Sequence, residues 1–201
     1  MSLTDGKIHD VFKELINIGV GKAVSVLNDM IQMEIELEVP DIQIATLDKF
    51  RSNLLLIDNT KITKVTLEFE GALNGFCELI VPYDNAKKIT SILIDEQFDS
   101  PELNMAVEGT VTELGNILLN GVMGTFSNVL DMHLDYIIPS YHEENLHNYS
   151  STHHKPEVSL ALVCKTKFYI DTIGFDGTIL VIFRENDIDT LEWMLQEKLD
   201  E

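Results

Sequence analysis

The chain has 201 residues, 45% of them hydrophobic, and a formal net charge of -20 at pH 7. This composition suits one globular domain, or two small fused halves, with a real core. The charge argues against nucleic acid and anionic membranes as partners, because both are bound through clustered Lys and Arg. No apolar run reaches the roughly 18 to 20 residues that span a bilayer, and no secretion signal is recognisable, so we expect a cytoplasmic protein.

The first predicted helix covers about residues 5–30. Six apolar residues recur at helical spacing and are expected to face the core: Phe12, Leu15, Ile16, Ala23, Leu27 and Met30. Gly19 and Gly21 each cost such a helix about 1 kcal/mol relative to Ala. Their presence suggests that another backbone approaches closely at both positions.

A polar face lies opposite this apolar stripe. Asp10, Glu14, Asn17 and Gly21 follow one another at spacings of four, three and four residues. On an α-helix this spacing places all four on one side. Asn is a poor residue for a helix interior, so its presence beside a Glu is compatible with a site that faces outward.

The rest of the first half has the alternation of strands and a second helix. Pattern and turn residues predict strands at 35–39, 42–44 and 54–57, and a hairpin of 64–70 and 76–81 around 71–75. Asp84 is expected to cap the helix that follows the hairpin.

The second half begins with a similar long helix. Ser100-Pro101-Glu102 is a favourable helix start, and the helix should run to about Leu130. Further strands are expected at 133–138, 158–170 and 178–183, and Asp187 is expected to cap a final helix. Trp193 is expected to be a packing anchor on the apolar side of that helix.

Two groups of residues contain potential metal ligands or reactive thiols, but their patterns favour a structural interpretation. Cys77 and Cys164 are far apart in strand-like runs, which favours buried, reduced thiols over a disulfide. The polar stretch 142–155 contains His142, His147, His153 and His154 near several glutamates, but its spacing matches no established metal-ligand pattern. A solvated loop is the favoured interpretation.

The Glu-x-x-Asn pattern occurs twice, at an offset of 99 residues: Glu113 and Asn116 stand in the second long helix where Glu14 and Asn17 stand in the first. The sequence therefore predicts a single domain made of two repeats, about 1–98 and 99–201. A lone Glu-x-x-Asn is usually just solvated surface, but its duplication suggests a site. The pattern provides no nucleophile. A carboxylate can pair with a partner's lysine, and an amide can hold a water in line for attack on a phosphoryl group.

These residues resemble the CheC/CheX/FliY family of chemotaxis phosphatases, whose signature is Asp or Ser, then Glu, then Asn, followed by Ile and a glycine-containing helix. Asp10, Glu14 and Asn17 match it, as do Glu113 and Asn116. The second copy has Gly109 in place of the Asp or Ser and Asn120 in place of a glycine. The hairpin text F-E-G-A-L-N-G-F-C-E-L-I-V-P is also similar, and the resemblance covers almost the whole chain. It is closest to CheC, which has two motif copies.

The resemblance implies an α+β fold with pseudo-twofold duplication, in which a sheet carries two long, exposed motif helices. It also implies hydrolysis of the aspartyl phosphate on a CheY-like response regulator. Glu14 and Glu113 would pair with the regulator's lysine, and Asn17 and Asn116 would orient the water. No cofactor would be bound by this chain, because the regulator would supply Mg²⁺.

CheD, which CheC proteins bind, is a further partner that the resemblance suggests. One alternative is a binding module of the same fold that holds CheD or a receiver domain without catalysis. Another is a flagellar switch scaffold, disfavoured because no switch domain like that of FliY is recognisable.

Overall fold

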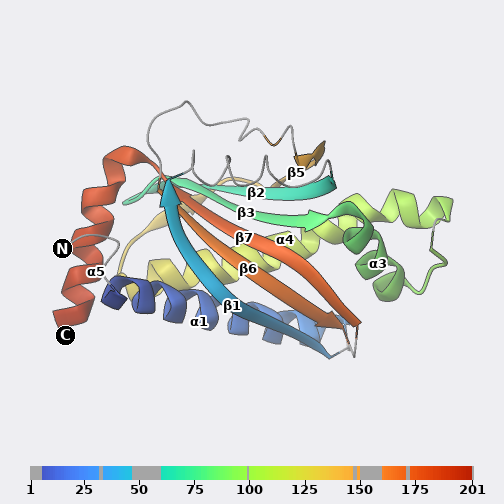
Figure 1. Cartoon of the computed structure of the whole chain (residues 1–201), viewed down its shortest axis with the longest axis horizontal. Coiled ribbons are helices and arrows are strands. Elements are labelled where there is room, and N and C mark those ends of the chain that lie inside the picture. The colour runs from blue at the N-terminus through green and yellow to red at the C-terminus, as the bar shows by residue number, and fades with distance from the viewer. Residues whose placement is uncertain are drawn as a thin grey trace.

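The computed structural model describes residues 6–31, 34–46, 60–98, 100–146, 149, 160–170 and 173–200. Within these residues, a seven-stranded antiparallel sheet carries two long helices, α1 and α4, along one face (Figure 1). Two shorter helices, α3 and α5, lie near opposite ends of the sheet. The predicted α+β class is therefore confirmed. None of the described helices is both long and apolar enough to cross a membrane.

The two long helices form where the apolar periodicity predicts them, as α1 (Gly6–Ile31) and α4 (Pro101–Val129). The hydroxyl oxygen of Ser100 accepts a hydrogen bond from the Leu103 amide at 3.0 Å, which caps α4 as expected. Five of the six stripe residues of α1 are buried. Met30 is 55% exposed, so its assignment to the core was wrong.

The strands alternate between the two halves of the chain. Their bounds are β1 (Ile35–Thr46), β2 (Lys61–Gly71), β3 (Gly75–Pro82), β4 (Leu134–Tyr136), β5 (Ser140–Asn145), β6 (Leu160–Ile170) and β7 (Ile173–Phe183). The order across the sheet is β1-β6-β7-β3-β2-β4, and β5 also pairs with β2. If β2 is matched with β6, β3 with β7, and β1 with β4 and β5, this order is the same from either edge. Such symmetry is expected of two duplicated halves.

Several strand predictions differ from the structure. Residues 142–145 were assigned to a polar loop, but they belong to β5, which pairs with β2 from Lys61↔Asn145 to Thr66↔Ser140. Backbone pairing to a neighbouring strand can order a segment that has no apolar periodicity of its own. β1 is longer than expected and continuous across Pro40, with a register shift between Glu38 and Asp41. The strand predicted at 54–57 lies outside the described residues.

β5 is also attached to β2 through side chains. The Lys61 ammonium lies 2.5 Å from a Glu143 carboxylate oxygen, and the Tyr141 hydroxyl donates to the other oxygen at 2.8 Å. Burial opposes ionisation of Glu143, but these two partners outweigh it and lower its pKa. Burial likewise works against the Lys61 cation, yet its contacts with Glu143 and Tyr83 raise the Lys61 pKa.

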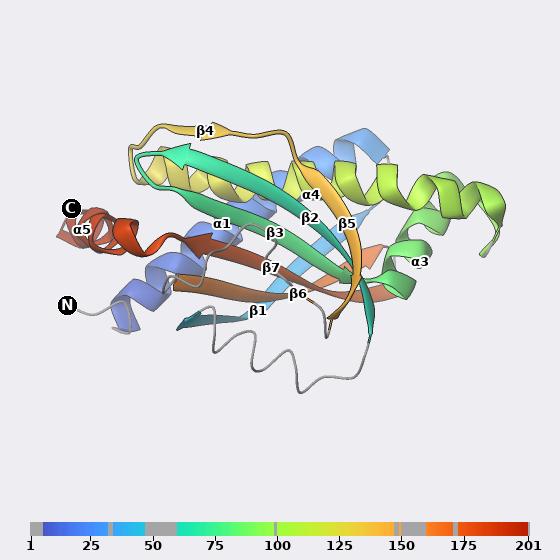
Figure 2. The same cartoon turned by 90° about the horizontal axis from the view of Figure 1, so that it is seen from above.

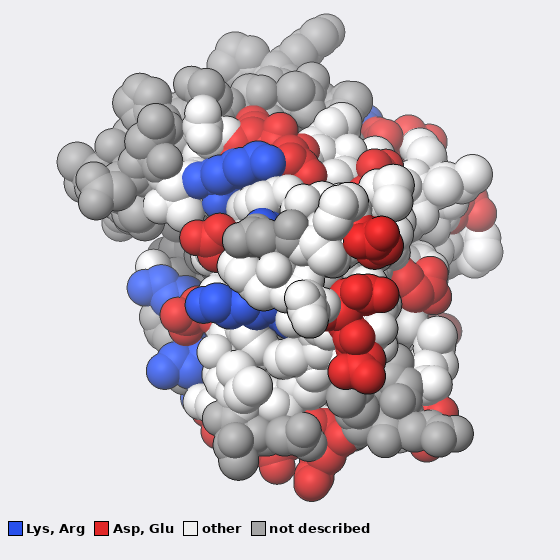
Figure 3. Space-filling view, turned by 90° about the vertical axis from the view of Figure 1, so that its right-hand side faces the viewer, with Lys and Arg blue, Asp and Glu red and all other residues white. Residues whose placement is uncertain are grey.

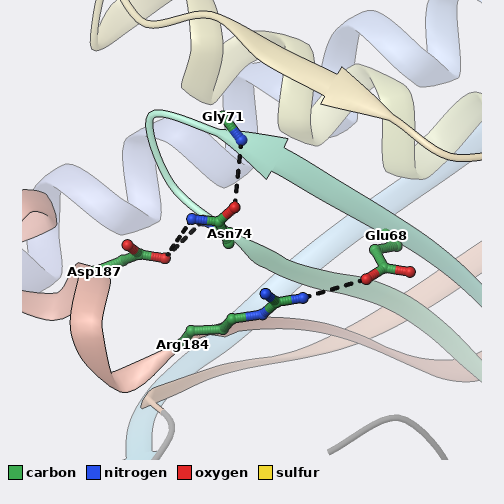
Figure 4. A network of polar contacts seen from close by, with 5 residues as sticks. All are labelled: Glu68, Gly71, Asn74, Arg184 and Asp187. Carbon is green, nitrogen blue, oxygen red and sulfur yellow. Dashed lines mark hydrogen bonds and ion pairs between the residues drawn. The ribbon is translucent and has the colours of Figure 1, made fainter.

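The turn between β2 and β3 is hydrogen-bonded to the C-terminal part of the chain (Figure 4). A carboxylate oxygen of Asp187 accepts hydrogen bonds from the Asn74 backbone amide at 2.8 Å and from its side-chain amide at 3.1 Å. Nearby, the Arg184 guanidinium lies 3.3 Å from Glu68. Asp187 was expected to cap the final helix. It lies just before α5 (Ile188–Asp200), in the short turn η2 (Glu185–Asp187), and its carboxylate accepts the hydrogen bonds from Asn74 instead.

Two expectations about the shorter helices were wrong. In α3 (Tyr83–Ile94) the capping position is Pro82, without a side-chain cap bond, and Asp84 lies inside the first turn. Trp193 of α5 is 57% exposed, so it is not a packing anchor. Leu191 and Leu195 of α5 are the residues that are buried.

The main core lies between the long helices and the sheet. It contains Phe12 and Phe126, whose rings stack with centroids 6.1 Å apart. Cys77 and Cys164 are both buried and form no disulfide, as predicted. Burial raises the pKa of Cys77 well above its ordinary value, which keeps that thiol protonated.

Candidate functional site

The first Glu-x-x-Asn pair lies on the outer face of α1. Glu14 and Asn17 are both exposed, and so are Asp10 and Gly21 on the same side of the helix. Within the described part of the chain, neither Glu14 nor Asn17 uses its side chain in a hydrogen bond or an ion pair. The carboxylate and the amide of this pair are therefore available to a partner.

The second pair lies on α4 in a different setting. Glu113 is exposed, but Asn116 is half-buried. Gly109, which replaces the Asp of the first copy, is also exposed and has no atom within 4 Å of the position that a Cβ would occupy. A larger side chain at position 109 would therefore fit without displacing anything.

The close contact of α1 and α4 brings the two pairs onto one surface. A Cβ added at Gly19 would lie 2.6 Å from the Val122 Cα, and one added at Gly121 would lie 2.8 Å from the Gly19 carbonyl oxygen. Only glycine permits this approach. The helices run in opposite directions (Figures 1 and 2), and each pair precedes the crossing in its own helix. The pairs therefore lie on opposite sides of the crossing.

The close backbone approach predicted at Gly21 is absent among the described residues. A Cβ added there would meet nothing within 4 Å, so no backbone approaches it. The residue that sequence reasoning missed is Gly121, which faces Gly19 from α4. Its signal in the sequence was a glycine within an otherwise strong helical pattern.

Asn116 has a side-chain partner of its own, in contrast to Asn17. The Asn120 side-chain amide donates to the Asn116 backbone carbonyl at 2.7 Å and to the Asn116 side-chain carbonyl oxygen at 2.7 Å. Asn120 occupies the position that corresponds to Gly21 in the first copy. The sequence marked this position as a departure from glycine, but it did not predict the hydrogen bonds.

A shallow hollow adjoins the second pair, between the two helices. Its volume is about 350 Å³, and it is lined by Lys22, Ala23, Val26, Asn116, Ile117, Asn120 and Gly121. Lys22 is exposed and contributes the only basic residue of this lining. At an offset of 99 residues Lys22 corresponds to Gly121, so the first pair has no matching cation from the equivalent position. The two pairs thus differ in their charged surroundings.

Charge is unevenly distributed on the end of the molecule where α3 lies (Figure 3). Carboxylates form a band on one side of this face, and Lys and Arg gather on the other. Two lysines lie over the ring of Tyr83, Lys61 at 3.5 Å and Lys87 at 6.0 Å from its centroid. Positive charge is therefore present locally on a strongly acidic chain.

No group of three or more His, Cys, Asp or Glu that could hold a metal ion occurs among the described residues. His142 lies in β5. His147, His153 and His154 lie outside the described residues, so the interpretation of the histidine stretch stays a prediction for them.

The sequence is similar to that of a known chemotaxis protein. No family model matches the sequence. The chain is 25% identical over 175 residues to the CheY-P phosphatase CheC of Bacillus subtilis, a match that covers 83% of this chain and 79% of that protein. The resemblance to the CheC/CheX/FliY family is confirmed.

Solved structures show the same fold. Thermotoga maritima FliY superposes with a TM-score of 0.76 at 15% identity, covering 98% of this chain and 100% of FliY. CheX in the CheX–CheY complex with BeF₃ and Mg²⁺ from Borrelia burgdorferi superposes with a TM-score of 0.51 at 22% identity, covering 85% of this chain and 97% of CheX. At these identities the two structures establish the CheC/CheX/FliY fold and no more.

Proposed function

We propose that this protein is a CheC-like phosphatase that hydrolyses the aspartyl phosphate of a CheY-type response regulator in chemotaxis. The observation that carries the proposal is the pair of Glu-x-x-Asn motifs on two contacting helices, each with its Glu exposed. Sequence similarity to CheC over most of the chain supports this function, as does a CheX structure of the same fold in complex with CheY.

Each motif residue has a distinct role in this proposal. Glu14 pairs with a lysine of the regulator and fixes the docked orientation. Asn17 enters the regulator's active site and aligns a water with the phosphorus, because its side-chain carbonyl oxygen can accept a hydrogen from that water. Glu113 and Asn116 act in the same way at the second site. Asp10 supports the first motif without taking part in the chemistry, and Gly21 leaves the space beside the motif open.

The protein needs no nucleophile of its own in this mechanism. In phosphoryl transfer, positioning and electrostatic stabilisation contribute most of the catalysis, and the Mg²⁺ that neutralises the developing charge belongs to the regulator. The chain adds the aligned water and the docking contacts. The water oxygen forms a new bond to phosphorus while the bond from phosphorus to the aspartate oxygen breaks, so inorganic phosphate is released, the aspartate carboxylate is restored, and the water's proton passes to the phosphate or to solvent.

The test is the decay of a phosphorylated CheY-type receiver with Mg²⁺ present. The wild type is compared with Asn17→Ala, Asn116→Ala and the double variant, and thermal unfolding checks that each is folded. We expect faster decay with the wild type, slower decay with each single variant and no acceleration with the double variant. Retained acceleration by a folded double variant would refute the assignment of the asparagines.

A binding module that holds CheD or a receiver domain is the second candidate. Gly109 favours it for the second motif, because glycine cannot supply the polar group that Asp10 provides in the first. The same experiment separates the candidates. Binding of a phosphorylated receiver, measured by titration, without any change in its phosphate lifetime would establish the binding module.

A further inference from the structure

We propose that Asn120 is a positioning residue, which holds the side-chain amide of Asn116 in the orientation that the second site uses. The inference rests on the proposed phosphatase function. It concerns a position outside the Glu-x-x-Asn motif at which the two sites differ, Asn120 in the second and Gly21 in the first.

The hydrogen bonds determine how both amides are oriented. The Asn116 backbone carbonyl is an acceptor only, so the Asn120 atom that lies 2.7 Å from it must be the amide nitrogen. That nitrogen is also 2.7 Å from an Asn116 side-chain atom, which must therefore be the carbonyl oxygen. The Asn120 amide uses both hydrogens in these bonds. Asn116 retains a second lone pair on its carbonyl oxygen and both hydrogens of its own amide.

This arrangement suits the proposed task. An exposed Asn samples several rotations of its side chain, and selecting one of them costs conformational entropy when the partner docks. Asn120 restricts Asn116 before docking. The remaining lone pair can accept a hydrogen from the attacking water, while the free amide hydrogens can donate to a phosphoryl oxygen.

The first site provides an internal comparison. Gly21 stands where Asn120 stands in the second copy, so no side chain at that position can hold Asn17. A Cβ added at Gly21 meets nothing within 4 Å, so an asparagine fits there. The restraint can therefore be removed from one site and introduced at the other in the same protein.

Removal is tested in the Asn17→Ala background, where only the second site operates. Asn120→Ala removes both hydrogen bonds, and Ala is the better helix former, so the helix is not weakened. Asn120→Asp keeps the size of the side chain but cannot donate while it is ionised. Because one hydrogen bond is a modest interaction, we expect kcat to fall about two- to tenfold in both variants, with KM nearly unchanged.

Introduction is tested by Gly21→Asn in the Asn116→Ala background, where only the first site operates. We expect kcat to rise by a similar factor, about two- to tenfold. An independent readout is the NMR signal of the Asn116 side-chain amide in ¹⁵N-labelled protein. This signal should shift in Asn120→Ala even when no receiver is present.

The possible results distinguish failure of the role proposed for Asn120 from failure of the proposed phosphatase function. If the wild type does not accelerate decay of any receiver that it binds, the phosphatase proposal and the role of Asn120 both fail. If Asn17→Ala still accelerates decay and the double variant Asn17→Ala, Asn120→Ala turns over equally fast, the phosphatase proposal stands and the role of Asn120 is refuted. An unchanged kcat in folded Gly21→Asn likewise counts against the inference.

Discussion

The backbone of Gly19 lies directly against that of Val122: a Cβ at Gly19 would be 2.6 Å from the Val122 Cα. Backbone on the second helix cannot move aside as the end of a flexible side chain can. The spacing of α1 and α4 therefore depends on the lack of a side chain at this position.

Gly19→Ala is expected to destabilise the protein by about 1–3 kcal/mol, because the added methyl overpacks the helix crossing. Gly21→Ala is the matched control two residues away. Its methyl would point into open space, so the better helix propensity should stabilise the protein by about 0.5–1 kcal/mol. Urea unfolding measures both. Equal effects of the two substitutions would contradict the close crossing.

Gly109→Asp is expected to strengthen the second site by supplying the polar group that Asp10 provides in the first. The position is open, so the side chain fits. Phosphatase activity in the Asn17→Ala background should rise about two- to fivefold, the range of one surface polar contact. Gly109→Ala controls for helix stabilisation alone. If Gly109→Ala raises activity as much as Gly109→Asp, the polar group has no role.

Lys22 is expected to assist the second site only, because it lines the hollow beside Asn116 and its positive charge would attract the negatively charged phosphoryl site of a docked regulator. In the Asn17→Ala background, Lys22→Met should lower kcat/KM about two- to fivefold at low salt and less at high salt. Lys88→Met removes the same charge from the exposed face of α3 and should have little effect. A similar loss in both variants would indicate only a change in net charge.

The bonds from Asp187 to Asn74 are expected to stabilise the β2–β3 turn. Asp187→Ala should cost about 1–3 kcal/mol in unfolding free energy, because two hydrogen bonds to a charged acceptor are lost and the Asn74 amide loses its partner. Glu185→Ala, at an exposed position in the same turn, is the control and should change stability by under about 0.5 kcal/mol. A stability loss in Glu185→Ala equal to that in Asp187→Ala would attribute the effect to the turn itself.

Glu143 should contribute a pH-dependent increment to stability. Its pKa is lowered in the folded protein by Lys61 and Tyr141, so the folded state favours the ionised form. That contribution is full above the unfolded carboxyl pKa, near 4.5, and is lost as pH falls through the lower folded value. The difference in urea-unfolding free energy between wild type and Glu143→Gln should therefore shrink from pH 7 to pH 3. A difference that is constant over this range would contradict the ionic contribution.

Local sequence patterns predicted most of the elements, because helical and alternating periodicities report which side of an element is buried. They predicted α1 and α4, the β2–β3 hairpin and the Ser100 cap. They do not show whether another element covers an apolar position, so Met30 and Trp193 were wrongly assigned to the core. The bond from Asp187 to Asn74 joins residues 113 positions apart, which no local capping pattern can report.

In the candidate site too, features set by local spacing were predictable and features set by contacts between distant residues were not. The two Glu-x-x-Asn pairs were recognisable because helical spacing fixes which residues share a face. The helix contact at Gly19 was expected, but its partner Gly121 and the open position of Gly21 depend on how two distant helices cross. Asn120 was visible only as a departure from glycine, since its bonds to Asn116 require the folded side chains.

The order of strands in the sheet also has a consequence for the folding of the chain. β6 and β7 come from the second half, yet they lie between β1 and β3 of the first, so neither half holds a contiguous sheet. Either half alone would keep one paired set of strands, β2 with β3 or β6 with β7, but would leave β1, or β4 and β5, without a partner strand. The chain must bring Ile35 to Ile170 before its first strand has a partner, which predicts slow folding.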